Sequence, residues 1–377
     1  MFGSDHRCYS TRSWSSVRQH RPPSILIVNL EEDAKFMAEA VEVAEKARFR
    51  SSPNPWVGVT VVANGEVVGK GFTGPFTAVK EAEKLRDASQ LEEEFEPGTG
   101  SHAEITALIE AGELANGATL YTTLEPCSHH GRTGPCTDAI IESGIKRVVV
   151  ALVDPDERVS GSGVEALRSA GVVVDVGQNS TDVDKQLAPY LHHRRTGRPY
   201  VLLKLAATLD GRIAAPDGSS NWITGEEARI DAHKLRAESD AICVGAGTVR
   251  IDDPRLTVRS VDGPSPRRIV IGEIPEGAQV EPAEPWKGPL EDLIQKLGDE
   301  GVLQLLVEGG AGLAGQMHRE GLVDRYVIYV SPSIMGGDDG KPLLSGDGVA
   351  TMESISRGKF ANVTQLGEDV RLDLVLS

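Results

Sequence analysis

The stretch TLEPCSHHGRTGPC, residues 123–136, places two cysteines and two adjacent histidines in one short segment broken by glycine and proline. The chain has only four cysteines, which are too few and too widely spaced for a disulfide framework. Three interpretations are open for this segment: a metal site, a disulfide between Cys127 and Cys136, or an ordinary loop. The sequence upstream of it favours the metal site.

A second motif, His-Ala-Glu at 102–104, lies at the predicted start of a helix, and Pro126-Cys127 follows a predicted strand. An imidazole and two thiolates supply three protein ligands and leave a fourth position for water, which is typical of a catalytic zinc site. A carboxylate two residues from the histidine can move protons without binding the metal, as hydrolytic removal of an amino group requires. Zinc deaminases carry His-x-Glu…Pro-Cys-x-x-Cys, whereas here the second cysteine lies nine positions after the first.

Length and charge limit the other possibilities. A chain of 377 residues exceeds what one hydrophobic core usually fills, which favours two domains. The formal net charge of −17 argues against a surface for nucleic acid or anionic membranes, and leaves a small anionic substrate open. The apolar run at 24–30 is too short to span a bilayer, so we expect a soluble, cytoplasmic protein.

Residues 1–27 differ from the rest of the chain. They are rich in serine and arginine and nearly free of acidic residues. We expect a disordered tail or an extension upstream of the true start, with an organelle-targeting segment as the alternative.

Helical and strand patterns alternate over residues 28–177. Apolar residues recur with helical spacing in 31–49, and two strand patterns flank Asn64-Gly65, which predicts a β-hairpin. Further expected elements are helices at 76–96, 102–115, 136–144 and 164–171, and strands at 118–126, 147–155 and 172–177. The alternation predicts an α/β sandwich on a mixed or parallel sheet.

A basic, turn-forming segment at 191–199 marks a boundary, and we expect residues 178–198 to be a linker. The alternation then restarts in a second α/β domain over 199–377. Its expected elements are strands within 200–214 and at 241–247, 267–272, 303–310 and 325–332, and helices at 226–239, 289–301 and 312–321.

The second domain lacks Gly-x-Gly-x-x-Gly after its first strand, so a Rossmann site is not indicated. The glycine-rich run VEGGAGLAGQ at 307–316 can still present backbone N–H groups to a phosphate. Arg236, Arg255 and Arg259 offer bidentate phosphate donors in this acidic chain, with surface ion pairs as the alternative for each.

Several motifs, in order, resemble the bifunctional riboflavin-biosynthesis deaminase/reductase family. In the first half these are PNPWVG at 53–58, HAEITAL at 102–108 and TLEPCSHHGRTGPC, whose long cysteine spacing is that of the family's deaminase half. In the second half they are RPYVLLKLAATLDGRIA, GSSNWITGEEAR, LRAESDAICVGAGTVRIDDPRLTVR and LLVEGGAGLAGQ. The resemblance leaves out residues 1–27 and an insertion at 73–101.

For the first half, the resemblance implies a cytidine-deaminase-like α/β/α sandwich. His102, Cys127 and Cys136 would hold Zn²⁺, Glu104 would be the catalytic proton shuttle, and Asn54 would bind substrate. His129 and His130, with Arg132, would face the substrate; the alternatives are a fourth ligand of a structural zinc site or a loop-stabilising hydrogen bond. The 73–101 insertion would be a surface helix, or alternatively a lid or a subunit contact.

For the second half, the resemblance implies a dihydrofolate-reductase-like α/β domain that uses NADPH. The residues expected to contact NADPH are Ala206, Trp222, Thr248, Asp252, Gly310, Ala311, Gly312, Leu313, Ala314, Gly315 and Gln316. The residues expected to hold the ribose phosphate are Ser220, Arg236, Leu256, Arg259 and Glu308. Lys204 and Asp252 would assist the hydride step, and packing is the alternative role of Trp222.

Together these features imply deamination of a phosphoribosylated diaminopyrimidine, then reduction of its ribosyl group, by a homo-oligomer that binds neither nucleic acid nor membranes. One departure is Gly272-Glu273, where relatives usually carry an acidic or hydroxyl pair; another is the shorter segment that follows it. Both leave the preference for NADPH over NADH open, and keep a deaminase with a degenerate reductase half as the alternative. The rivals are a nucleoside or nucleic-acid deaminase and a non-catalytic zinc-stabilised binding protein.

Overall fold

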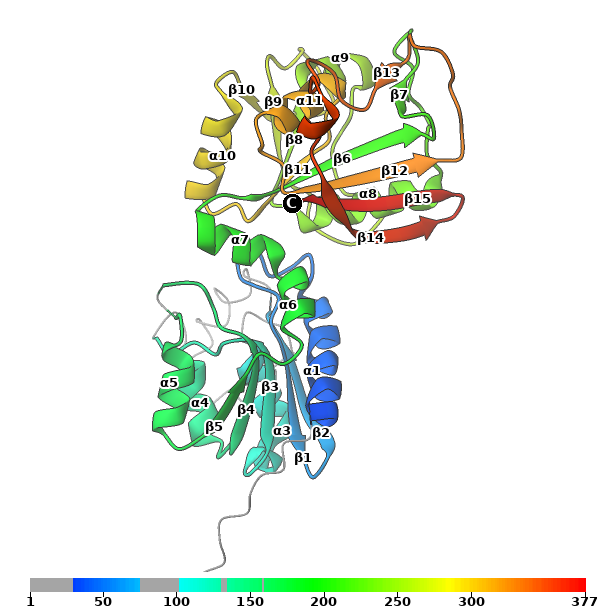
Figure 1. Cartoon of the computed structure of the whole chain (residues 1–377). Helices are drawn as coiled ribbons and strands as arrows, with labels where there is room; N and C mark the ends of the chain where they lie inside the picture. The colour runs from blue at the N-terminus through cyan, green and yellow to red at the C-terminus, as the bar shows by residue number, and fades with distance from the viewer. Residues whose placement is uncertain (1–29, 75–101, 130–133, 158) are drawn as a thin grey trace, which may run out of the picture.

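The computed structural model describes residues 30–74, 102–129, 134–157 and 159–377, which form two α/β domains (Figure 1). The predicted tail, the predicted helix at 76–96, nearly all of the 73–101 insertion, and His130 and Arg132 lie outside the described residues. Within them, none of the helices has the length and apolar character needed to cross a membrane.

The first domain is built on a five-stranded sheet in the order β2-β1-β3-β4-β5. Its strands are β1 Gly58–Ala63, β2 Glu66–Phe72, β3 Thr119–Leu124, β4 Arg147–Leu152 and β5 Val173–Val176. Its helices are α1 Leu30–Ala44, α3 Ala103–Ala111, α4 Cys136–Glu142 and α5 Ser162–Ser169. β1 runs antiparallel to both neighbours, and β3, β4 and β5 are parallel, so the sheet is mixed as expected.

Helices cover both faces of this sheet, which confirms the predicted α/β/α sandwich. Gly58 in β1 meets α1, where an added Cβ would lie 2.0 Å from the Ala40 carbonyl oxygen. Gly71 in β2 meets α3, where an added Cβ would lie 1.9 Å from the Ala103 carbonyl oxygen. Val59 pairs with Gly71, so Gly58 and Gly71 lie on opposite faces of the sheet.

The predicted linker at 178–198 is largely helical: it contains α6 Ser180–Gln186 and α7 Ala188–Thr196. The expectation of a turn-forming segment was wrong for 191–196, and the turn comes at Gly197, whose φ is 73°. The physical reason is that Val183, Leu187 and Leu191 repeat with helical spacing and are buried in the first domain's core. α7 also contacts β6 of the second domain, so this segment joins the two domains as packed structure (Figure 1).

The second domain is built on an eight-stranded sheet in the order β10-β9-β8-β11-β6-β12-β15-β14. Its strands are β6 Tyr200–Thr208, β8 Ala241–Gly245, β9 Arg267–Ile271, β10 Glu284–Trp286, β11 Gln304–Val307, β12 Arg325–Ser331, β14 Gly358–Leu366 and β15 Asp369–Leu376. Its helices are α8 Glu226–Glu238, α9 Ala246–Asp252, α10 Leu290–Asp299 and α11 Ala311–Arg319. The pairs from β10 to β12 are parallel, and β15 and β14 add an antiparallel edge. A short ribbon pairs β7 Arg212–Ala214 with β13 Lys341–Pro342.

Strand residues alternate between two apolar layers. Val201, Leu203 and Leu205 of β6 pack with α10 and α11, whereas Leu202 packs with α8 and α9 on the other face. The sheet is therefore covered on both sides, as the expected α/β domain requires. The sequence interpretation did not include α9, β10, β13, β14 or β15.

A candidate metal centre and a candidate cofactor cavity

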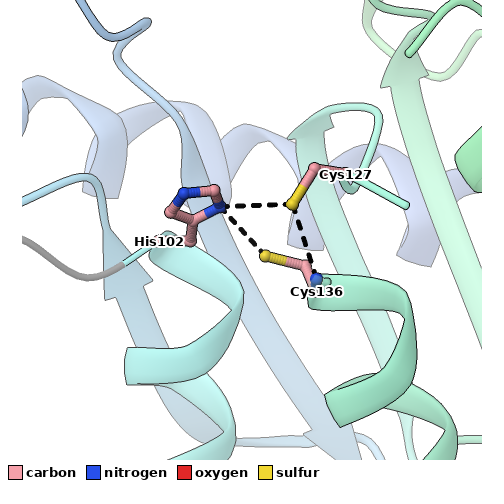
Figure 2. A group of neighbouring side chains, drawn as sticks. All are labelled: His102, Cys127 and Cys136. Carbon is pink, nitrogen blue, oxygen red and sulfur yellow. Dashed lines mark hydrogen bonds between the residues drawn. The ribbon is translucent and has the colours of Figure 1, made fainter. Parts of the chain in front are cut away.

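Three side chains from separate elements converge in the first domain (Figure 2). His102 directly precedes α3, Cys127 follows β3, and Cys136 is the first residue of α4. The His102 Nδ1 atom lies 3.1 Å from the Cys136 Sγ atom and 3.5 Å from the Cys127 Sγ atom. Zn–N bonds of about 2.0 Å and Zn–S bonds of about 2.3 Å in a tetrahedron would separate the nitrogen from each sulfur by about 3.5 Å. The three residues therefore fit a zinc ion.

The three ligands share protons. Hydrogen bonding from the Cys136 thiol and the His102 ring holds the pKa of Cys127 well below its usual range, at about 4. Hydrogen bonding to Cys127 raises the pKa of His102 to about 9, and Cys127 and burial raise the pKa of Cys136. A metal cation binds thiolates and neutral imidazole, so it would displace the protons that this network holds.

Glu104, the predicted proton shuttle, lies on the first turn of α3 and is buried, with 4% of its surface exposed. Burial raises the pKa of its carboxyl group, and the neighbouring His102 lowers it. The carboxylate is thus shielded from bulk water and within electrostatic range of the three predicted ligands.

The geometry distinguishes between the alternative interpretations of the cysteine segment. Cys127 and Cys136 are free thiols, so they form no disulfide. In the described part of the chain, His102, Cys127 and Cys136 are the group in which three potential ligand atoms converge, and His129 is not a member. The Nδ1 atom of His129 is buried and lacks a hydrogen-bond partner. Among the described residues, the group therefore offers three ligand atoms.

The second domain contains a cavity of about 1200 Å³. A drug-sized ligand occupies a pocket of roughly 300–1,000 Å³, so this cavity has room for a dinucleotide together with a sugar phosphate. The predicted site residues that line it are Lys204, Ala206, Ser220, Trp222, Arg236, Thr248, Asp252, Leu256, Arg259, Glu308, Gly310, Ala311, Gly312 and Leu313. Residues from strand ends, α8, α9 and the start of α11 thus meet in one place.

The remaining predicted residues lie elsewhere. Ala314 is fully buried in the core, an added Cβ on Gly315 would lie 2.0 Å from the Ser345 carbonyl oxygen, and Gln316 donates to Glu320. These three lie on the second turn of α11, beyond the residues that face the cavity. Asn54 lines a small pocket between the domains.

One carboxylate and two cations organise the floor of the cavity. Arg236 donates to both Glu308 oxygens, over 2.6 Å and 2.9 Å, and the Lys204 Nζ atom lies 3.9 Å from Glu308. The two cations overcome burial and hold the pKa of Glu308 at about 2, while burial lowers the pKa of Lys204. Asp252 accepts a 3.4 Å hydrogen bond from Ser220, and burial raises the Asp252 pKa.

The sequence interpretation missed His233 in this cavity. Arg229, Ala232, His233 and Arg236 all line it, and their spacing along α8 is that of one helix face. His233 could therefore have been predicted from its position three residues before Arg236 on the same helix face. Lys341 and Ser345 also line the cavity, from a segment that has no periodic apolar pattern.

The departure at Gly272-Glu273 has a structural explanation. Gly272 has a φ of 111°, and an added Cβ would lie 3.0 Å from the Ala246 Cβ atom, so the position favours glycine. Glu273 pairs with Lys287 over 2.8 Å at the surface. Neither residue is among those that line the cavity.

Known families match both domains. Residues 30–152 match the cytidine and deoxycytidylate deaminase zinc-binding region, and residues 199–372 match the RibD C-terminal domain. These matches fit Zn²⁺ at the His-Cys-Cys group and NADPH in the second domain. They confirm the expected deaminase-like and reductase-like halves.

Whole-chain similarities agree. The chain is 40% identical to the riboflavin biosynthesis protein RibD of Aquifex aeolicus over 370 residues, covering 90% of this chain and 97% of the relative. A solved RibD of Acinetobacter baumannii is 34% identical with a TM-score of 0.81, covering 92% of this chain and 99% of its own. A diaminohydroxyphosphoribosylaminopyrimidine deaminase/5-amino-6-(5-phosphoribosylamino)uracil reductase of Thermotoga maritima is 32% identical with a TM-score of 0.78, at the same coverage. The chain therefore belongs to the RibD family of bifunctional riboflavin-biosynthesis deaminase/reductases.

Proposed function

We propose that the chain catalyses two successive steps on one phosphorylated pyrimidine. The first domain hydrolyses an amino group of the diaminohydroxyphosphoribosylaminopyrimidine and forms 5-amino-6-(5-phosphoribosylamino)uracil and ammonia. The second domain reduces the ribosyl group of that product to ribityl with NADPH. The observation that carries the proposal is the convergence of His102, Cys127 and Cys136 near buried Glu104, on a chain that also contains the Lys204 cavity.

In the first domain, His102, Cys127 and Cys136 would hold Zn²⁺, which supplies a Lewis acid that makes water nucleophilic near neutral pH. Glu104 takes a proton from the attacking water and delivers it to the ring amino group, which leaves as ammonia. Because Glu104 is 4% exposed, its proton is kept from exchange with bulk water. Asn54 remains a predicted substrate ligand.

In the second domain, the charges of the cavity suit a phosphate. The cavity is lined by six cationic side chains against three carboxylates, Asp252, Asp253 and Glu308; the cations are Lys204, Arg229, Arg236, Arg255, Arg259 and Lys341. Arg236 is already paired with Glu308, whereas the Arg259 guanidinium contacts only Thr257 in the described structure. Arg259 is therefore the main phosphate ligand, and Arg236 with Glu308 orients the ribose.

The hydride step needs an acid beside the sugar. NADPH bound in this cavity would supply the hydride that reduces the open-chain ribosyl carbon, and a proton must reach the same substrate from the protein. Lys204 is the proposed proton donor, because its lowered pKa makes its ammonium group a stronger acid. Asp252, bonded to Ser220, and the cavity-lining part of α11 would hold the cofactor.

The test separates the two activities on one chain. We expect Glu104→Gln to lower the deaminase kcat by about 10²- to 10⁴-fold, while zinc content and NADPH oxidation with pre-deaminated substrate stay unchanged. An anaerobic titration with NADPH and that substrate follows the second step. Absence of NADPH oxidation by the wild-type protein would leave a deaminase alone, and full deaminase activity of Glu104→Gln would refute the role of Glu104.

Three further assignments belong to the proposal. The deaminase domain spans 28–177 and the reductase domain 199–377, joined by the helical segment 178–198. The protein is a homo-oligomer, because β14 is an edge strand on which Phe360 is 62% exposed and Val363 is 58% exposed. Its location is the cytoplasm, because free thiols suit a reducing compartment. Sedimentation of the wild-type protein and of a Phe360→Lys, Val363→Lys variant tests the subunit contact.

A further inference from the structure

The carboxylate of Glu125 accepts four backbone hydrogen bonds. Its Oε2 atom accepts from the N–H groups of Asp154 at 3.2 Å and Gly161 at 2.9 Å. Its Oε1 atom accepts from Gly163 at 2.8 Å and Val164 at 3.0 Å. The side chain is 4% exposed, so it is built into the fold at the N-terminus of α5, where a negative charge is favourable.

Two more contacts attach the same segment to α5. Ser128 and Ser162 share a hydrogen bond of 2.7 Å between their hydroxyl groups. Gly163 packs directly under Pro126, because an added Cβ would lie 2.0 Å from the Pro126 carbonyl oxygen. The segment 125–128 is therefore held on both sides of Cys127 by the first turn of α5.

Cys127 is also held by the start of α4. On its opposite side, Cys136 N–H donates to the Cys127 Sγ atom at 3.4 Å, and Thr137 N–H donates to the Cys127 carbonyl oxygen at 3.2 Å. Cys127 thus lies between two helix starts, α4 and α5. The start of α4 carries the second thiol of the metal group, and the start of α5 carries no ligand.

We propose that Glu125 is a positioning residue of the metal centre. It ties the Cys127 segment to the first turn of α5 and so fixes the distance between the two thiols. Four charge-assisted hydrogen bonds to backbone N–H groups leave it little freedom to move. This inference rests on the proposed metal site and adds a residue that neither binds the metal nor touches the substrate.

Glu125→Gln tests the inference, because the amide replaces an acceptor by a donor that faces N–H groups. We expect zinc affinity, measured by competition with a chelator, to fall by about 10- to 100-fold, the range for partners that orient metal ligands. The visible spectrum of the Co²⁺-substituted protein should change, since it reports ligand geometry. The matched control is Glu165→Gln, an exposed acid on the same turn of α5, which should retain wild-type affinity.

A second variant guards against a folding defect. Gly163→Ala pushes α5 away from Pro126 and from the Glu125 carboxylate, whose Oε1 atom would lie 3.1 Å from the added Cβ, while the Glu125 side chain itself is kept. We expect it to weaken zinc binding and alter the Co²⁺ spectrum as well. NADPH oxidation with pre-deaminated substrate, on the same chain, shows that the second domain is folded. Wild-type zinc affinity and Co²⁺ spectrum in both variants would overturn the inference. Failure of the wild-type protein to bind one zinc ion would instead overturn the proposed metal site.

Discussion

At the scale of single residues, the surroundings of His233 in the cavity determine whether its ring is protonated. Its Nδ1 atom accepts a 3.2 Å hydrogen bond from the backbone N–H group of Arg259, so the ring is neutral in this arrangement. Burial and the charges of Arg236, Arg259 and Lys204 lower the pKa of His233 to about 4, against the opposing effect of Glu308. Protonation would break the Arg259 contact and add a cation to a positive cavity.

This predicts a pH dependence of stability. Between pH 4 and 6.5 the unfolded chain binds a proton at His233 that the folded chain does not, so the free energy of unfolding falls as the pH falls. The slope from this residue is at most about 1.4 kcal/mol per pH unit. His233→Gln keeps an acceptor for Arg259 and should lose this component in urea unfolding at pH 5 and 7. An identical pH dependence in both proteins would contradict the assignment.

A second prediction concerns the acid of the hydride step. Glu308 raises the pKa of Lys204, although burial outweighs it and the net direction is downward. Removing that carboxylate by Glu308→Gln lowers the Lys204 pKa further, so the basic limb of the kcat profile for NADPH oxidation should move to lower pH. The control Glu273→Gln removes an exposed carboxylate paired with Lys287 and should leave the profile unchanged. A basic limb that stays in place would show that Lys204 does not titrate there.

At the scale of elements, the approach of α3 to the sheet sets the place of His102. Gly71 in β2 leaves no room for a Cβ against the Ala103 carbonyl oxygen, one residue after the predicted ligand. We expect Gly71→Ala to push α3 outward, with a loss of about 1–3 kcal/mol of stability and weaker zinc binding. Lys70→Ala, the neighbouring change that removes a surface ion pair with Glu39, should cost less than about 1 kcal/mol. Equal effects from both variants in thermal unfolding and zinc titration would argue against close packing as the cause.

The elements that the sequence predicted are those with a strong apolar period. β1 is buried along nearly its whole length and α1 carries a buried stripe, so both stand out as patterns. β14 is exposed along most of its length and has no alternation to detect, although its partner β15 alternates through Val370, Leu372 and Leu374. Of the two strands of the hairpin that the sequence interpretation missed, only β15 has an apolar alternation that could have predicted it.

The two candidate sites differed in how far residue chemistry alone could predict them. The metal group was predictable because few side chains bind zinc, and three of them stand in distinctive motifs. The cavity of the second domain has less distinctive chemistry: the sequence indicated its arginines and the glycine-rich run 307–316 as phosphate donors, but the assignment of single residues to NADPH or to the ribose phosphate came only from the family resemblance. Glu125 escaped notice because its partners are backbone N–H groups, which leave no trace in the sequence.

At the scale of the whole molecule, helix α8 contacts the first domain and also lines the cavity of the second domain. α8 presents Arg236 to the cavity, and two residues later it presents Glu238 to the first domain. Arg48, beyond α1, donates to Glu238 over 2.8 Å, and Ser52 bonds to Asp240 close by. The orientation of the first domain and the position of Arg236 are therefore set through the same helix end.

Loss of the Arg48–Glu238 ion pair should weaken substrate binding in the reductase site and leave the metal site unchanged. The Glu238 side chain is 10% exposed while that of Arg48 is 38% exposed, so Arg48→Met leaves a mostly buried carboxylate without its partner. We expect a loss of about 1–3 kcal/mol, below the range for fully buried pairs because Arg48 is partly solvated. The KM of the reductase step should rise, while zinc affinity stays at its wild-type value.

Calorimetry and steady-state kinetics of Arg48→Met, Glu238→Gln and the double variant measure the coupling, since partners in contact give non-additive effects. Additive stability effects with an unchanged KM would mean that Arg48 and Glu238 are not energetically coupled, and that α8 does not transmit the contact to Arg236.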